Sequence, residues 1–174
     1  MIDTEKLYKA SLDTKTKWIT YIFLLVMGGL LYKSFEALQR PSYGSNNSSI
    51  YVIIIIILLV ILVNSWIKKV QFYQLTEDLL IIKTFHEQIK IPLYEIKHIH
   101  ENNQIPGGPI REIGTKGLFG YRGRYFLGQW GYVNFFATQK KNLILIETLN
   151  LGIFVISPDD MELFNRLQNY IEHE

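Results

Sequence analysis

The chain has 174 residues, which is enough for one domain of ordinary size and an accessory segment. Its 18 basic and 16 acidic residues nearly balance, so it lacks the strong positive charge typical of nucleic-acid-binding proteins. It has no cysteine, which excludes disulfides, thiolate metal ligands and catalysis by a thiol. Apolar residues are concentrated near the N-terminus, and the chain from Lys68 onward is net neutral.

Residues 1–17 are predicted to be a cytoplasmic segment that precedes the first long apolar stretch. Within it, Leu7 to Leu12 alternates only weakly between apolar and polar residues. Two interpretations remain open: a short strand that joins a sheet of the following domain, or a disordered tail.

Two apolar stretches predict a transmembrane hairpin over residues 18–67, with helices at about 18–38 and 50–67. The second stretch has eighteen residues without a charge and would span roughly 27 Å as a helix, a length that single strands rarely reach. The first reaches full length only if Lys33 extends its amine to the membrane surface. A cleaved signal peptide is the alternative there, but no small-x-small cleavage site follows Leu31.

The segment between the two predicted helices, Arg40 to Ser49, is rich in proline, glycine and short polar residues, as in a turn. Basic residues near the helix ends favour one orientation, because six lie on the side of the termini and two, Lys33 and Arg40, on the other. Both termini are therefore expected in the cytoplasm, with Trp18 and Trp66 at that membrane interface. The six are Lys6, Lys9, Lys15, Lys17, Lys68 and Lys69.

Residues 68–174 are predicted to form a mainly β domain. Short apolar runs alternate with turn signals, which is typical of an antiparallel sheet whose neighbouring strands pair as hairpins. About seven strands are expected: Val70 to Leu75, Leu79 to Phe85, Gln88 to Ile91, Ile96 to His100, Tyr132 to Thr138, Leu143 to Thr148 and Gly152 to Ile156.

A C-terminal helix is predicted after the last strand. Ser157 is expected as its N-cap and Pro158 as its first residue, with two aspartates facing the positive end of the helix dipole. An apolar stripe at helical spacing predicts that this helix packs on the sheet. The stripe consists of Met161, Phe164, Leu167 and Ile171.

This order of strands with one closing helix resembles the bacterial pleckstrin-homology-like (PH-like) domain families, in which a transmembrane hairpin often precedes the domain. Three stretches carry the resemblance: IPLYEIKHI at 91–99, GTKGLFGYRGRYF at 114–126, and the chain from Val133 onward, which includes NLILIETLNLGIFVISPDDMELF at 142–164. These motifs are structural, so the resemblance implies a fold and does not define an activity.

No set of residues suited to catalysis converges in the sequence. His98 and His100 share one face of a predicted strand but lack a third ligand, so they are interpreted as surface histidines. The glycines at 114, 117, 120 and 123 fit neither the Walker nor the dinucleotide-binding pattern and are interpreted as turn residues. We therefore expect no enzymatic activity, no cofactor and no bound metal.

The positive charge of the domain is concentrated in one interval. Asn102 to Lys141 has six basic residues against one acidic residue, and Asn142 to Glu174 has the reverse. Because this interval is the longest between predicted strands, its basic residues are predicted to form a patch that faces the membrane or a partner. The alternative is that its aromatic residues fill the core while the basic ones keep the surface soluble. The predicted patch consists of Arg111, Lys116, Arg122 and Arg124.

Together these observations favour a non-catalytic, membrane-tethered PH-like binding or assembly module at the cytoplasmic membrane surface. Its expected partners are the lipid bilayer and an anionic lipid headgroup, a protein, or further copies of the chain. Nucleic acid is not expected. The alternative function is a subunit of a membrane enzyme or transport complex. The predicted spans hold no charge at mid-membrane, which argues against an autonomous transporter.

Overall fold

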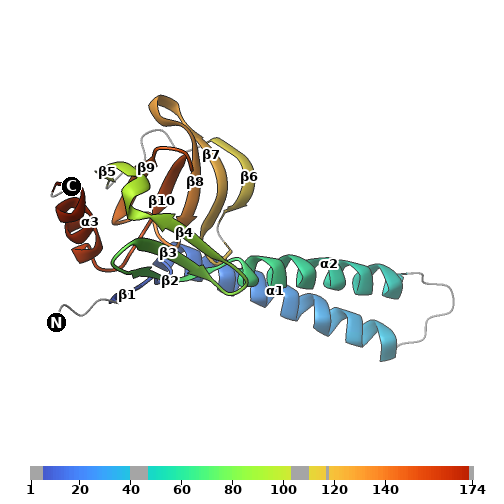
Figure 1. Ribbon diagram of the computed structural model, residues 1–174. Coiled ribbons are helices and arrows are strands. Elements are labelled where there is room, and N and C mark those ends of the chain that lie inside the picture. Colours follow the sequence, from blue (N-terminus) through green and yellow to red (C-terminus); the bar gives the residue numbers. More distant parts are fainter. Residues whose placement is uncertain (1–5, 40–46, 103–109, 117, 173–174) are drawn as a thin grey trace.

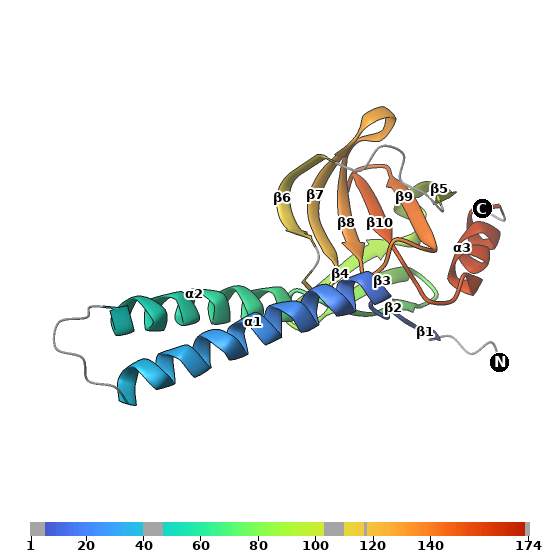
Figure 2. The same cartoon turned by 180° about the vertical axis from the view of Figure 1, so that it is seen from behind.

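The computed structural model describes residues 6–39, 47–102, 110–116 and 118–172. Two long antiparallel helices, α1 (Thr14–Gln39) and α2 (Asn47–Ile67), lie side by side and extend from one side of a β domain (Figures 1 and 2). A third helix, α3 (Glu162–Glu172), packs on the opposite side of the domain. Single turns of 3₁₀ helix occur at Leu93–Glu95 and Gly128–Trp130.

In the described part of the chain, two sheets hold ten strands. One has the order β1-β2-β3-β4 and the other the order β5-β9-β10-β8-β7-β6. The first comprises β1 (Lys6–Lys9), β2 (Val70–Leu75), β3 (Leu79–Thr84) and β4 (Gln88–Pro92). The second comprises β5 (Ile96–Asn102), β6 (Ile110–Lys116), β7 (Tyr121–Leu127), β8 (Gly131–Ala137), β9 (Leu143–Thr148) and β10 (Ile153–Ile156).

The mainly β domain with a C-terminal helix is confirmed, but the strand count and one pairing differ from the prediction. The interval expected as a long loop contains β6 and β7, which pair with each other. Strand β10 pairs antiparallel with β9 but parallel with β8, so the sheet is not a simple series of hairpins. In the N-terminal segment, the strand predicted within Leu7 to Leu12 is confirmed in part: Lys6–Lys9 pair antiparallel with β2, whereas residues 10–12 are not in a strand.

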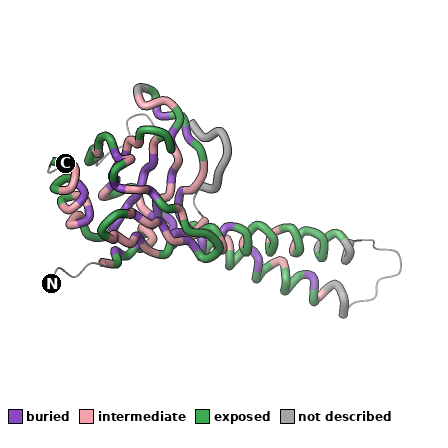
Figure 3. The backbone as a smooth tube through the Cα atoms, in the orientation of Figure 1, coloured by how far each residue is buried: buried purple, intermediate pink, exposed green. Residues whose placement is uncertain are grey.

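The hydrophobic core lies on both faces of the six-stranded sheet. In strand β9, Ile144 and Ile146 belong to a cluster between the two sheets and α3, whereas Leu143 and Leu145 belong to a cluster with β7 and β8. All four side chains are buried, because this strand lies inside the sheet and both of its faces are covered. Figure 3 shows the contrast between the buried domain interior and the largely exposed helices α1 and α2.

The start of α3 differs from the prediction. Ser157 is fully buried and its Oγ accepts a hydrogen bond from the Thr138 backbone N–H at 2.8 Å, so the hydroxyl joins strand ends and does not cap the helix. The helix begins at Glu162, whose N–H donates to Asp160 Oδ1 at 2.9 Å. Its buried residues are Leu163, which the predicted stripe lacked, and Leu167. The other stripe residues, Met161, Phe164 and Ile171, are partly buried against the core.

One buried tyrosine links the two sheets through its hydroxyl. Tyr73 on β2 donates to the Phe136 carbonyl at 2.7 Å and accepts from the Ser157 N–H at 3.0 Å. Burial raises the pKa of the Tyr73 phenol far above its ordinary value, which keeps the hydroxyl protonated and able to donate.

Tyr73→Phe is expected to lower the free energy of unfolding by about 1–3 kcal/mol, because it leaves the buried Ser157 N–H and the partly buried Phe136 carbonyl without this partner. The measurement is urea unfolding of the full chain in detergent micelles, followed by near-ultraviolet circular dichroism. Tyr94→Phe is the matched control, since Tyr94 is exposed. Equal midpoints for the two variants would contradict the linking role.

Candidate functional site

The four basic residues predicted to form a patch lie on two paired strands. Arg111 and Lys116 are on β6, opposite Tyr125 and Tyr121, and the other two are on β7. The premise of a long loop was therefore wrong. The side chains of β6 lie outside the part of the chain that the structure describes. That the four basic side chains form one surface patch therefore stays a prediction.

Arg122 contacts three separate parts of the molecule. Its guanidinium forms an ion pair with Glu87 in the β3–β4 turn, and its Nη1 donates to the Lys68 carbonyl at 2.9 Å, just after α2 ends. Its Cζ lies 5.2 Å from the centroid of the Phe136 ring. The side chain is partly buried, which lowers the pKa of the guanidinium, and its partners keep it in place. Arg122 therefore joins the β domain to the end of α2.

Arg124, two residues further along β7, has different surroundings. It is exposed, and its Cζ lies 4.5 Å from the centroid of the Tyr132 ring on β8. A guanidinium over an aromatic ring is held weakly at an exposed site. Arg122 and Arg124 thus share a strand but have different roles: the first is a structural contact, and the second remains accessible on the surface.

The β3–β4 turn, Thr84–Glu87, lies against the end of α2. Three hydrogen bonds between Thr84 and Glu87 close the turn: one from the Thr84 N–H and two through the Thr84 hydroxyl, at 2.9–3.0 Å. At its tip the Phe85 ring is 56% exposed and lies 4.8 Å from the Trp66 ring, centroid to centroid. The turn therefore holds two aromatic side chains together where the helix meets the domain.

The start of α1 is joined to the same end of the domain. Asp13 caps the helix by accepting from the Thr16 N–H at 2.6 Å, and its own N–H donates to the Thr138 carbonyl at 3.4 Å. Burial raises the pKa of the nearby Tyr121 phenol, and the Asp13 carboxylate raises it further. Lys140 lies over the Tyr121 ring at 5.6 Å from its centroid.

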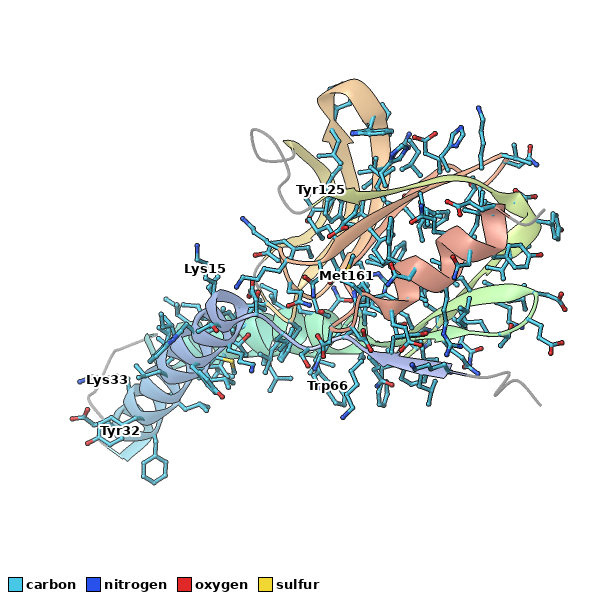
Figure 4. All side chains as sticks on the ribbon, turned by 90° about the vertical axis from the view of Figure 1, so that its left-hand side faces the viewer. Lys15, Tyr32, Lys33, Trp66, Tyr125 and Met161 are labelled. Carbon is cyan, nitrogen blue, oxygen red and sulfur yellow. The ribbon has the colours of Figure 1, made fainter. Side chains whose placement is uncertain are left out.

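Six lysines surround the place where the two helices meet the domain, and we call them the junction lysines. All are exposed or partly exposed, and they come from both helix ends and from the β8–β9 turn. Figure 4 shows Lys15 and Trp66 near this junction, whereas Tyr32 and Lys33 lie at the far end of α1. The junction lysines are Lys15, Lys17, Lys68, Lys69, Lys140 and Lys141.

The histidines do not form a metal site within the described residues. The rings of His98 and His100 are 6.3 Å apart, and His100 lies 4.8 Å from the Trp130 ring and 3.3 Å from a Glu147 oxygen. Among the residues that the structure describes, no group of three or more histidine, cysteine, aspartate or glutamate side chains is placed to hold a metal ion.

Gly120 has a backbone role at the entry to β7. Its φ is +122°, and a Cβ there would lie 2.8 Å from the Ala137 carbonyl oxygen. Only glycine fits this conformation beside the neighbouring strand. The glycine-rich interval therefore includes a close approach of two backbones.

Helix α1 contains a segment, Thr14–Glu36, that is long and apolar enough to cross a membrane. In α2, the apolar stretch among the described residues is the shorter Val52–Ile67.

Arg122→Gln is expected to lower the free energy of unfolding by about 1–2 kcal/mol and to speed amide exchange in the β3–β4 turn, because Glu87 and the Lys68 carbonyl lose a charged partner. The matched control is Arg124→Gln on the same strand, for which a loss below about 1 kcal/mol is expected. Equal losses and unchanged exchange at the turn would show that Arg122 does not join the turn to α2.

One comparison with known proteins supports this fold. No curated protein and no solved structure matches the chain. Residues 71–170 match the family described as Bacterial PH domain, which is more than half of the chain and runs from β2 into α3. The protein therefore belongs to the bacterial PH domain family.

Proposed function

We propose that the protein is a membrane-anchored, non-catalytic binding module, in which α1 and α2 cross the bilayer as a hairpin and hold the PH domain at its cytoplasmic surface. The observation that carries the proposal is the distribution of polar and apolar side chains on the two helices. It is the reverse of the pattern found in water-soluble helical proteins.

Among the described residues of α1, three of the four that are buried, Thr16, Thr20 and Ser34, bear a hydroxyl group, and the fourth is Met27. Thr20, Met27 and Ser34 are buried and recur every seven residues, so they lie along one side of the helix. The Thr20 and Ser34 hydroxyls donate to backbone carbonyls one turn earlier, each at 2.9 Å, which satisfies them inside the helix. Small and hydroxyl-bearing residues are typical of helix contacts within membranes.

The residues that the helices expose are large and apolar. Leu25 on α1 is 76% exposed and Val60 on α2 is 58% exposed. On α2 the same holds for most of the isoleucines, leucines and valines from Val52 to Val63, while Ser65 is buried. A surface of this size is unfavourable in water and favourable in hydrocarbon. At about 1.5 Å per residue, the 26 residues of α1 extend over roughly 39 Å, which exceeds the hydrocarbon core of a bilayer.

The pairing of β1 with β2 supports two crossings. These strands flank the helix pair in the sequence and are hydrogen-bonded in one sheet, from Lys6 opposite Leu75 to Lys9 opposite Phe72. The ends of the helix pair therefore lie on one side of any membrane that it enters. If α1 crosses, the chain has to cross back before β2, and α2 is the segment that lies there.

Charge supports the cytoplasmic side for the domain. The junction lysines lie where both helices meet the domain, and basic residues are retained on the cytoplasmic side of membranes. Each contributes about 1 kcal/mol of attraction when it lies near an anionic leaflet.

A binding module also predicts the outcome of cross-linking in intact membranes. The chain should be linked to lipid, to a binding protein or to further copies of itself, and not to the subunits of an enzyme complex. Recovery of such an enzyme complex would instead favour a subunit role.

Because the chain has no cysteine, single cysteines can report its topology. A cysteine at Ser45, between the two helices and outside the described residues, is expected to react with an impermeant thiol reagent in whole cells. One at exposed Lys141 is expected to react only after the membrane is opened. Reaction at Lys141 in closed cells would contradict the cytoplasmic placement, and loss of both variants on carbonate extraction would contradict insertion.

A further inference from the structure

The tip of the β3–β4 turn exposes an apolar side chain on a rigid support. Phe85 is 56% exposed although the turn beneath it is closed by the Thr84 hydrogen bonds described above. An exposed phenylalanine costs free energy in water, and the hydrogen bonds of the turn hold the Phe85 backbone at the tip. The Phe85 ring contacts the ring of Trp66, which is itself 46% exposed.

The position of the turn along α2 is fixed by two contacts. The ring contact between Phe85 and Trp66 aligns the tip with the last turn of α2, and the Arg122 side chain bonds both Glu87 and the Lys68 carbonyl. Lys68 follows Trp66 by two residues in the sequence, and the Phe85 ring lies beside Trp66. Tryptophan flanked by lysine is the arrangement that membrane proteins place at the headgroup level.

The charge distribution of the domain also favours an orientation with the β3–β4 turn toward the membrane. The junction lysines lie near the turn, whereas acidic residues such as Glu162 and Glu172 lie on α3, on the side of the domain opposite the two helices (Figure 1). An anionic leaflet would attract the first group and repel the second. Both effects favour the same orientation of the domain.

We propose that the β3–β4 turn docks the PH domain on the lipid bilayer, with Phe85 inserted beside Trp66 among the headgroups. This inference rests on the proposed membrane anchoring, and it adds a second attachment that is made by the domain itself. The helices hold the domain near the membrane, and the turn sets its height and tilt. The occupant of this surface is lipid, and the phosphate groups of an anionic headgroup pair with the junction lysines.

The test places a fluorescent label that reports lipid contact on the residue after Phe85, so that Phe85 itself is unchanged. His86→Cys carries the label, because His86 is exposed in the same turn. The full chain is reconstituted in nanodiscs of phosphatidylcholine and phosphatidylglycerol, with and without a lipid that carries a quencher near its headgroup. We expect a blue-shifted emission and a strong loss of intensity with the quenching lipid. Phe85→Ser in this background is expected to reverse both changes, and Phe85→Trp to retain them.

Two further labelled positions separate the possible failures. Leu149→Cys is the matched control, because Leu149 is 61% exposed and its N–H bonds the Glu95 carbonyl at the opposite end of the strands, so no quenching is expected there. Val60→Cys, within α2, reports insertion of the helix and is expected to be quenched by a lipid labelled deep in its acyl chain.

Quenching at Val60 without quenching at His86 would overturn the docking proposal and leave the membrane anchor intact. Equal quenching at His86 with phenylalanine or serine at position 85 would also overturn it, since the tether alone would then account for the proximity. Quenching at neither Val60 nor His86 would instead remove the membrane anchor, and with it the proposed function.

Discussion

The arrangement of this protein depends on the pairing of β1 with β2. These two strands precede α1 and follow α2, so the chain on both sides of the helix pair is held in one sheet. Ala10, four residues before α1, and Val70, three residues after α2, are buried in the same core cluster. The N–H of Asp159 also donates to the Lys9 carbonyl at 3.0 Å, which ties β1 to the segment before α3. The helices therefore extend from the sheet itself and are not carried on a free linker.

Burial of both faces of the six-stranded sheet determines where contacts with other molecules can be made. Strand β9 contributes to a core cluster on each face, so neither face is open around it. Near β9 the accessible features are consequently turns, whereas Arg124 on β7 and Tyr132 on β8 stay exposed in another part of the sheet. The turn Thr84–Glu87 is joined to the end of α2 by the ring contact between Phe85 and Trp66, and by Arg122, which pairs with Glu87 and donates to the Lys68 carbonyl. The fold thus places an exposed aromatic residue, on a hydrogen-bonded turn, next to the segment that is proposed to enter the membrane.

The sequence predicted those helices and strands that have a clear hydrophobic pattern over consecutive residues. The apolar runs gave the correct positions of β2, β3 and β9, and the long uncharged stretches gave α1 and α2. Strand β7 was missed because its alternation of tyrosine with arginine and glycine has the composition of a loop, although Tyr121 and Tyr125 are buried. Ser157 has the sequence context of an N-cap, but burial commits its hydroxyl to the Thr138 N–H. Such competition between local and distant partners is decided by tertiary structure.

The candidate site was harder to predict because its contacts join residues far apart in the sequence. Nothing near Arg122 in the chain indicates that it binds Glu87 and the end of α2, and only the folded arrangement separates it from Arg124. Under the proposed membrane anchoring the distinction matters for function, because a domain that helices hold near a surface does not need strong contacts to stay there. A contact of about 1 kcal/mol adds little to residence but is comparable to the thermal energy that tilts the domain. Weak contacts at the junction are therefore sufficient to select one orientation, provided that the turn which makes them is rigid. The hydrogen bonds of Thr84 and the ion pair of Arg122 supply that rigidity.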